Sequence, residues 1–323
     1  MKRLFIAAKK EALERCFTES QMGTSRAVST EEFYQNPMEY QDVEFIFSTW
    51  GMPQFSEEEI RRYFPNLKAV FYAAGSVAAF ARPFFHCNVR IFSAWAANAI
   101  PVAEFTAAQI ILANKGYFQM TGRYRKGVRE AVDYAESFPG NYGARVGIIG
   151  LGMISTHVIR LLNACQLELY VYSRHLTEAD AKRMGVHKAE LDEIFETCQT
   201  ISNHLANKPE TVGCLNGRLF SRMKPNATFI NTGRGAQVDM EALKQAMREE
   251  PGRTALLDVT DPEPVDAGDD VWEIPNIFLT PHRAGSMTAE VRRMGQYMME
   301  AYEAFSDGTP AWEVKEEMLD TMA

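Results

Sequence analysis

Short apolar segments rich in β-branched and aromatic residues alternate along this chain with longer segments of mixed polarity. Apolar runs of roughly four to eight residues are typical of buried strands, whereas apolar positions three or four residues apart are typical of helices. Their regular alternation predicts βαβ units around parallel sheets, so we assign the α/β fold class. The predicted strands are RLFIAA, VEFIFSTW, LKAVFYAA and VRIFSA in the first hundred residues, then RVGIIG, LELYVYS, TISNHL, ATFINT, ALLDVT and NIFLT.

These strands fall into two groups, which predicts two domains. An alanine-rich segment, residues 98–116, separates the groups, and we expect a helix from about Pro101 to Lys115 within it. The first group suits a small α/β domain, and the six strands of the second suit a doubly wound dinucleotide-binding domain. Segments 18–42 and 123–142 show no clear period, so no element is predicted there.

Composition and charge narrow the classes of partner. The chain has 323 residues, 46% of them hydrophobic, and a formal net charge of −8 without a basic stripe, which disfavours nucleic acid and anionic membranes. We find no apolar run approaching the roughly 20 residues of a membrane span, and MKRLFIAAKK turns charged too early for a secretory signal. We therefore expect a cytoplasmic protein. The five cysteines lack C-x-x-C spacing, and no metal site is predicted.

The segment VGIIGLGMIS, residues 146–155, has the order of a dinucleotide-binding turn: a strand, a glycine-rich turn and a helix. The strand is predicted over residues 145–149. The apolar residues expected on one face of the following helix are Ile154, Val158, Leu161 and Leu162.

Each glycine of this segment has a separate role. Gly150 permits the tight turn, and Gly152 lets the backbone approach a pyrophosphate. The first amides of the helix, those of Met153 and Ile154, would stabilise the charge of the pyrophosphate. Ser155 stands where a third glycine is usual, and because serine is small and its hydroxyl can bond at a helix start, we expect the site to survive.

The end of the next strand indicates which dinucleotide is bound. NAD-binding domains place an acidic residue there to bind the adenosine ribose, but this chain has Ser173 followed by Arg174. A hydroxyl beside a guanidinium suits a 2′-phosphate. We therefore predict NADP(H) as the cofactor in preference to NAD(H).

Three further segments carry candidate catalytic residues, and each follows a predicted strand. They are INTGRG around Arg234, DVTDPEPV around Glu263 and LTPHRAGS around His282. Together with VGIIGLGMI and SNHLANKPETVGCLN, and in this order, they resemble the D-isomer-specific 2-hydroxyacid dehydrogenases over essentially the whole chain. The combination is specific, although no single segment would be.

The resemblance implies a role for each residue. Arg234 would bind the substrate carboxylate and polarise the carbonyl oxygen. His282 would be the general acid in reduction and the base in oxidation. Glu263 would lie behind the imidazole, where it sets the tautomer and favours the charged ring. Asp258 matches the family position that orients the nicotinamide carboxamide.

Other positions follow from the same resemblance. In the first domain, Gly75 and Ser76 of AAGSVAAF would bind the substrate carboxylate through backbone amides, although this loop has small apolar residues where the family has glycine and aspartate. Trp50 and Met52 either shape the substrate pocket or serve ordinary packing. The remaining candidate cofactor positions are His204, for which a structural histidine is the alternative, Thr211 and Gly233.

The family fold implies two domains with parallel sheets, Rossmann-like and flavodoxin-like, with the active site in the cleft between them. We expect residues 1–97 and 286–323 to form the substrate domain and residues 98–285 the dinucleotide domain. The predicted activity is reduction of a small 2-oxo acid to the D-2-hydroxy acid, by a homodimer that pairs through the helix at residues 101–115.

Two alternatives come from other classes. One is a nucleotide-sensing, corepressor-like binding protein of the same fold, and the other is a methyltransferase with an adenosyl cofactor. The complete set of arginine, glutamate and histidine favours the dehydrogenase, and consumption of NADPH with a panel of 2-oxo acids would distinguish the three.

Overall fold

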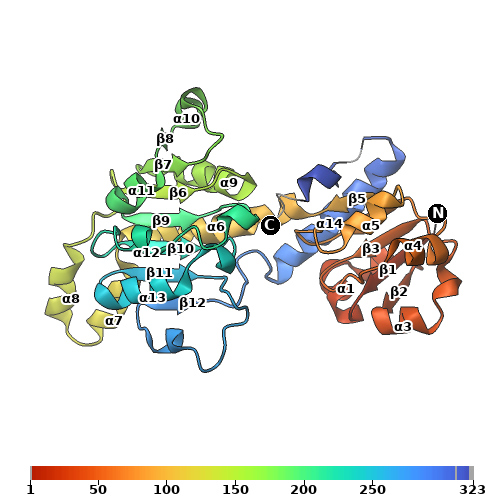
Figure 1. Ribbon diagram of the computed structural model, residues 1–323, viewed down its shortest axis with the longest axis horizontal. Helices are drawn as coiled ribbons and strands as arrows, with labels where there is room; N and C mark the ends of the chain where they lie inside the picture. Colours follow the sequence, from red (N-terminus) through yellow and green to blue (C-terminus); the bar gives the residue numbers. More distant parts are fainter. Residues whose placement is uncertain (1, 310, 320–323) are drawn as a thin grey trace. The chain divides into compact units, whose positions relative to one another are not determined.

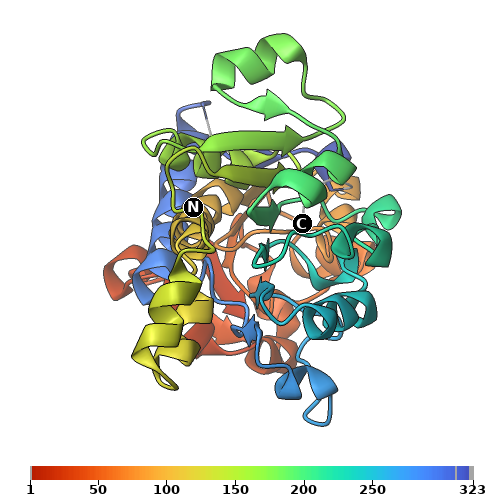
Figure 2. The ribbon, with the colours of Figure 1, turned by 90° about the vertical axis from the view of Figure 1, so that its left-hand side faces the viewer.

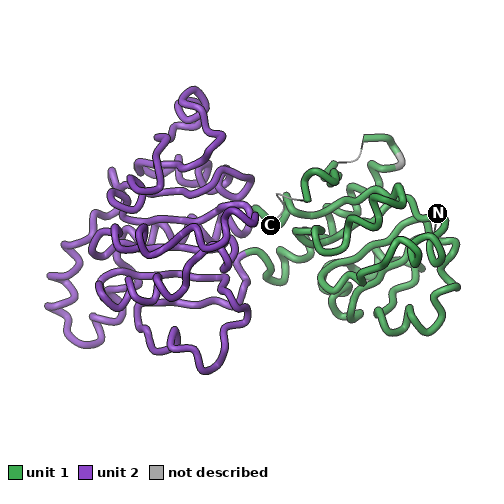
Figure 3. The backbone as a smooth tube through the Cα atoms, in the orientation of Figure 1, with its two compact units in different colours: residues 1–99, 285–323 green, residues 100–284 purple. Residues whose placement is uncertain are grey.

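The computed structural model describes residues 2–309 and 311–319. The chain divides into two compact units, unit 1 with residues 1–99 and 285–323 and unit 2 with residues 100–284 (Figure 3). The sequence analysis predicted the first domain boundary between residues 97 and 98 and the second between residues 285 and 286. Residues 1, 310 and 320–323 of the predicted substrate domain lie outside the described residues.

Unit 1 is built around a sheet whose strand order, within the described residues, is β13-β5-β4-β3-β1-β2. All pairs are parallel except β13 with β5. Strands β1 to β5 therefore follow the flavodoxin-like order 2-1-3-4-5. The strands are β1 (Arg3–Ala7), β2 (Arg26–Ser29), β3 (Phe45–Ser48), β4 (Ala69–Tyr72), β5 (Arg90–Ser93) and β13 (Glu313–Val314). The helices, with 3-10 helices marked η, are α1 (Lys10–Cys16), α2 (Glu19–Met22), α3 (Thr30–Gln35), η1 (Pro37–Tyr40), α4 (Glu57–Tyr63), α5 (Ala81–His86), α14 (Thr288–Ser306) and η5 (Glu316–Met318).

Apolar helix faces cover both sides of this sheet. Phe33 of α3, Ile60 of α4 and Phe84 of α5 are buried on one side. Leu13 of α1 and Met294 of α14 are buried on the other side. Helices cover both faces of these strands, which explains why β3 and β4 contain only buried residues and why, apart from Ser48, these are apolar or aromatic.

Unit 2 contains a parallel sheet in the order β12-β11-β10-β9-β6-β7-β8, within the described residues. This is the doubly wound order of dinucleotide-binding domains with one added strand, and the order reverses between β6 and β9. The strands are β6 (Arg145–Ile149), β7 (Glu168–Tyr172), β8 (His187–Lys188), β9 (Thr200–Asn203), β10 (Thr228–Asn231), β11 (Thr254–Leu257) and β12 (Ile277–Leu279). The helices are α7 (Tyr117–Tyr124), α8 (Val128–Ala135), α9 (Met153–Leu162), α10 (Glu178–Met184), α11 (Leu191–Thr197), η2 (Pro209–Thr211), α12 (Gly217–Phe220), η3 (Gly235–Gln237), α13 (Met240–Glu249) and η4 (Asp270–Glu273).

The sheet of unit 2 also has a core on each face. Phe195 of α11, Phe220 of α12 and Leu243 of α13 pack against one face. Val158 of α9 and Ala181 of α10 belong to the core of the other face. In Figures 1 and 2, β8 and α10 stand at one edge of the sheet, and β12 lies toward the opposite edge.

The helix α6 (Trp95–Asn114) differs from its prediction. It begins six residues before Pro101, which lies inside the helix rather than at its first turn, and it belongs to both units. The statement that no apolar run approaches a membrane span was wrong by length and composition, because this helix has 20 residues and a mean hydropathy of 1.3. Ala103 and Ile110 of α6 are fully buried in the core of unit 2, as in a core helix of a globular protein.

Two smaller differences concern strands and helix faces. The sequence analysis did not predict β2, β8 and β13; all three are short, β2 and β13 are only partly buried, and β8 is exposed. On α9, Val158 and Leu162 are buried as expected, but Leu161 is 40% exposed and Ile159 takes its place in the core. The buried face of a helix takes only about three to four residues in every two turns, so an error of two positions moves a side chain from the core to the solvent.

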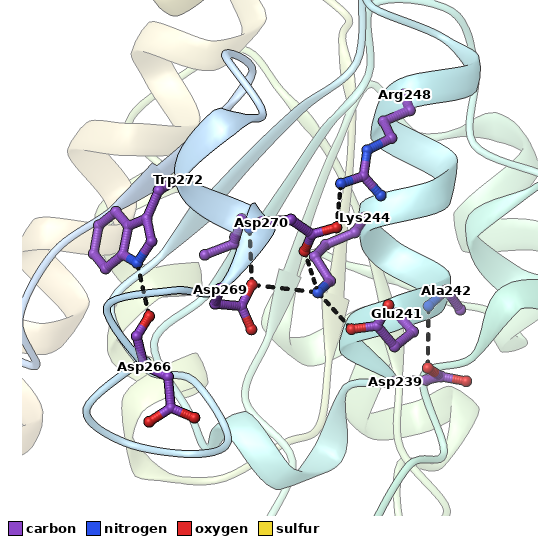
Figure 4. Close-up of polar contacts among 10 residues, drawn as sticks. Asp239, Glu241, Ala242, Lys244, Arg248, Asp266, Asp269, Asp270 and Trp272 are labelled. Carbon is purple, nitrogen blue, oxygen red and sulfur yellow. Dashed lines mark hydrogen bonds and ion pairs between the residues drawn. The ribbon is translucent and has the colours of Figure 1, made fainter.

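A buried lysine joins α13 to η4 (Figure 4). The Lys244 side chain is 4% exposed, and its Nζ lies 2.6 Å from Asp270 and 3.3 Å from Asp269, with Glu241 as a third partner. Burial lowers the pKa of Lys244, but the hydrogen bonds to these carboxylates outweigh it and the net pKa is raised. Arg248 also contacts Asp270 at 2.6 Å. The cluster therefore anchors the long connection between β11 and β12 to α13.

Asp270→Asn is expected to make the unfolding temperature less sensitive to acid. Hydrogen bonds from Lys244 and then Arg248 lower the pKa of Asp270 to about 2. The stability that this carboxylate contributes is complete above the pKa of an unfolded aspartate, about 3.9, and is lost as the pH falls toward the folded value. Thermal unfolding between about pH 5 and 2 should show a steeper loss in the wild type than in the variant. Parallel curves would contradict the role of the cluster.

Candidate active site

Three of the predicted site residues follow adjacent strands of unit 2. Arg234 comes after β10, Glu263 after β11 and His282 after β12, and these strands pair in parallel. The carboxyl ends of parallel strands lie at one edge of a sheet, which is where ligands bind in open α/β folds. The fold therefore brings residues 234–282 of the chain to the same edge.

His282 and Glu263 form a close pair. Nδ1 of the imidazole lies 2.6 Å from Oε1 of the carboxylate, and the two side chains are 47% and 43% exposed. A contact at Nδ1 orients the ring and directs Nε2 away from the carboxylate. This is the arrangement that an acid–base histidine needs.

The backbone of His282 is held in an unusual conformation. Its φ is +53°, in the left-handed region that residues other than glycine adopt rarely. Its amide donates to the carbonyl oxygen of Asp258 at 2.9 Å. The buried Asp258 carboxylate also accepts from the Thr280 hydroxyl at 2.6 Å and from the amides of Arg283 and Ala284 at 2.9 Å. Asp258, predicted to orient nicotinamide, thus supports the loop of His282.

Arg234 lies on a loop that is tightly packed against the Glu263 loop. Its Nη1 donates to the carbonyl of Gly233 at 2.8 Å. Burial lowers the pKa of the guanidinium, and the charge of Glu263 opposes that shift, so the two side chains are electrostatically coupled. A Cβ added at Gly235 would lie 2.0 Å from the carbonyl of Thr260. Only glycine therefore fits at this position without moving one of the two loops.

The glycine turn between β6 and α9 fits a dinucleotide. Gly150 has φ +93°, and a Cβ there would lie 2.5 Å from the carbonyl oxygen of His204. A Cβ at Gly152 would meet no atom within 4 Å among the described residues, so this position faces open space at the start of α9. Backbone amides at a helix start beside open space can hold a pyrophosphate, with Met153 and Ile154 as the donors. We therefore regard the turn as compatible with the predicted cofactor.

Ser155 replaces the third glycine by binding the helix start. It is buried, and its hydroxyl accepts from the Gly152 amide at 2.8 Å. The helix keeps its close packing because the side chain turns back onto its own backbone rather than into the strand.

The loop after β9 contains two further candidates. The His204 ring contacts the Ser202 hydroxyl through Nε2 at 2.9 Å, and its enclosed Nδ1 has no hydrogen-bond partner among the described residues. Burial lowers the pKa of His204 to about 4, so the ring is neutral at neutral pH. The Thr211 hydroxyl bonds within its own loop, to the carbonyls of Ala206 and Lys208.

The predicted phosphate-binding pair lies directly after β7. The Ser173 hydroxyl accepts from the amide of His175 at 3.3 Å. Arg174 is 62% exposed, and its Nη2 lies 3.6 Å from Oε1 of Glu210, which is 53% exposed. The sequence did not predict this acidic neighbour.

Across the described part of the chain, no group of three acidic, histidine or cysteine side chains could hold a metal ion.

The candidates in unit 1 follow β3 and β4. The carbonyl of Gly75 accepts a hydrogen bond from Ser93, and Ser76 is partly exposed beside it. Trp50 is 40% exposed, whereas Met52 is buried in the core, so the packing alternative describes Met52.

Asn98 is a site candidate that the sequence analysis missed. Its enclosed Oδ1 has no hydrogen-bond partner within residues 2–309 and 311–319, and its Nδ2 lies 3.8 Å from where a Cβ of Gly75 would be. A polar residue in an alanine-rich segment was the available signal, but we interpreted residues 98–116 only as the separation between the two groups of strands.

Comparison with known proteins relates the chain to one family. The family model described as D-isomer specific 2-hydroxyacid dehydrogenase, NAD binding domain, matches residues 107–284, more than half of the chain. This range corresponds to nearly all of unit 2.

Curated relatives match this chain over only part of their own length. The D-3-phosphoglycerate dehydrogenase of Haemophilus influenzae is 27% identical over 68% of this chain and 54% of that protein. The glyoxylate reductase of Korarchaeum cryptofilum is 31% identical over 52% and 50%. The chain thus spans about half the length of these curated relatives.

A solved structure resembles the whole chain in its fold. It is an NADPH-dependent glyoxylate/hydroxypyruvate reductase from Sinorhizobium meliloti, in complex with citrate, with a TM-score of 0.75 and 22% identity over 99% of this chain and 98% of that one.

Proposed function

Because this chain belongs to the D-isomer-specific 2-hydroxyacid dehydrogenase family, we propose that it reduces a small 2-oxo acid to the D-2-hydroxy acid, using NADPH in preference to NADH. The observation that carries the proposal is the 2.6 Å contact between His282 and Glu263, on loops at the same sheet edge as Arg234. Glyoxylate and hydroxypyruvate are the first substrates to test, since relatives of this chain are named for them.

Each residue has a defined task in the proposed reaction. The bound nicotinamide cofactor would supply the hydride. Arg234 binds the carboxylate of the 2-oxo acid through its planar, permanently charged guanidinium and draws electron density from the carbonyl oxygen. His282 donates a proton from Nε2 to that oxygen as the alcohol forms. Glu263 stabilises the positive ring through Nδ1, and Asp258 keeps the histidine loop in place.

The cofactor would bind along the carboxyl edge of unit 2. Met153 and Ile154 hold the pyrophosphate with their amides, and Ser173 and Arg174 bind the 2′-phosphate. Gly233, Thr211 and His204, on the adjoining loops, are the other residues proposed to contact the cofactor. Gly75, Ser76 and Trp50 stay predictions for the substrate carboxylate and side chain.

The primary test is consumption of NADPH by the purified protein with a panel of 2-oxo acids, followed by chiral analysis of the product. A D-2-hydroxy acid is expected. Absence of turnover across the panel with both NADPH and NADH would contradict the proposal.

Ser173→Asp combined with Arg174→Ala should move the preference toward NADH. The new carboxylate repels a 2′-phosphate, and the guanidinium that would pair with it is gone. Because these positions are partly exposed, we expect a change of about tenfold in the ratio of kcat/KM values rather than a complete switch. Steady-state kinetics with both cofactors measures the ratio. A wild type that already prefers NADH would show that Ser173 and Arg174 were interpreted wrongly.

A homodimer is the expected assembly. Five large apolar side chains between residues 112 and 132, on α6, α7 and α8, are exposed, and exposed apolar surface can mark a protein–protein interface. These residues are Leu112, Tyr117, Tyr124, Val128 and Val132. Light scattering at micromolar concentration should give twice the 36.5 kDa mass of the chain. A monomeric mass would refute the assembly.

A further inference from the structure

An acidic side chain lies beside the arginine that is proposed to bind a 2′-phosphate. The end of β7 carries Ser173 and Arg174, so the carboxylate usual in NAD-binding domains is missing from that strand. Glu210 supplies one from elsewhere: its Oε1 lies 3.6 Å from Nη2 of Arg174. Glu210 belongs to η2, which follows β9, and β6 separates β9 from β7 in the sheet.

The loop that carries Glu210 passes over the glycine turn and is held firmly. The amide of His204 donates to the carbonyl of Ile149 at 2.7 Å, at the end of β6. The Gln237 side chain donates to the carbonyl of Leu205 at 2.9 Å, and Thr211 closes the loop through its hydroxyl. Glu210 is therefore presented at the end of β7 by an ordered segment.

The carboxylate of Glu210 is ionised at neutral pH. A hydrogen bond from its own backbone amide lowers its pKa, and the charges of Lys208 and Arg174 lower it further. A fixed negative charge at this position would partly neutralise the Arg174 guanidinium and so weaken its attraction for a second anion. An uncharged ribose hydroxyl depends much less on that positive charge.

We propose that Glu210 is a specificity-determining residue that competes with a 2′-phosphate for the Arg174 guanidinium and so limits the preference for NADPH over NADH. The inference rests on the proposed function, because it assumes a dinucleotide at the glycine turn. Its consequence is that the wild type uses both cofactors, and that removing the carboxylate widens the preference for NADPH.

The pair is suited to mutation because it is exposed. Arg174 is 62% and Glu210 53% exposed, and ion pairs of this kind contribute little to folding stability. Glu210→Gln, Arg174→Gln and the double variant should therefore fold like the wild type. Glu273→Gln, an exposed glutamate on η4, is the matched control.

Calorimetry with two cofactor fragments tests the proposal without catalysis. Adenosine 2′,5′-bisphosphate carries the 2′-phosphate, and adenosine 5′-monophosphate lacks it. Glu210→Gln should tighten binding of the bisphosphate by about three- to tenfold, with less than about a twofold change for the monophosphate. In the Arg174→Gln background the same substitution should change bisphosphate affinity by less than about twofold. The kcat/KM ratio for NADPH over NADH should follow the binding data.

Three outcomes would overturn the inference. Unchanged bisphosphate affinity in Glu210→Gln removes the competition, while binding of the monophosphate would still support the dinucleotide site. An effect that persists in full without Arg174 shows simple repulsion rather than competition for the guanidinium. If neither fragment binds the wild type, the proposed function and the inference fail together.

Discussion

His282→Gln is expected to lower kcat for a turned-over 2-oxo acid by about 100- to 10,000-fold, the usual contribution of a positioned general acid. Glutamine keeps a hydrogen-bonding side chain of similar reach, and it can remain beside Glu263, but it cannot give a proton to the forming alkoxide. The affinity for NADPH should hardly change. Stopped-flow kinetics and cofactor binding, measured on the same preparation, separate the two effects.

Two further variants show whether that loss belongs to proton transfer. His187→Gln, on the exposed edge strand β8, should retain the wild-type rate. Glu263→Gln removes the carboxylate that orients the ring at Nδ1 but leaves the imidazole, so its kcat should fall less than that of the His282 variant. Near-wild-type turnover in the His282 variant would show that His282 is not the proton donor and would remove the proposed mechanism.

Arg234→Lys should lower kcat/KM by about 100-fold or more, through both a higher KM and a lower kcat. An ammonium keeps the positive charge, but it loses the planar fork that binds a carboxylate through two parallel hydrogen bonds. Lysine also cannot reproduce the contact of Nη1 with Gly233, which orients the side chain. Initial rates over a range of 2-oxo acid concentrations give both constants.

The matched control for this substitution is Arg183→Lys, on α10, whose side chain is 77% exposed. Its kinetic constants should equal those of the wild type. If Arg234→Lys changed kcat while leaving KM at the wild-type value, the arginine would act on the reacting oxygen without binding the substrate, contrary to the proposed clamp.

The strands were predictable where burial makes the sequence mostly apolar. Phe45 to Ser48 and Ala69 to Tyr72 are buried at every position, and such runs are recognised without knowledge of the fold. β2 has no fully buried residue, so its sequence carried no comparable signal. The start of α6 was misjudged because Pro101 was taken as a first helical residue, which is the commonest place for proline in a helix but not this one.

The candidate site was predictable as a set of residues, but its supporting contacts were not. Arg234, Glu263 and His282 stand in short motifs at strand ends, whereas the bonds from Asp258 to the histidine loop join residues 22 to 26 positions apart. The contact of Arg174 with Glu210 depends on how far the loop after β9 reaches across the sheet. Such pairings arise from tertiary structure and leave no local pattern.

The absence of space at Gly235 has an evolutionary consequence. With a Cβ only 2.0 Å from the Thr260 carbonyl, any other residue there must push apart the loops of Arg234 and Glu263. The two loops therefore cannot drift independently, and insertions in one require compensation in the other. A library randomised at position 235 and selected for growth-coupled turnover should return glycine almost alone. In a divergent chain, loss of that glycine would be an early sign that the catalytic arrangement has been abandoned.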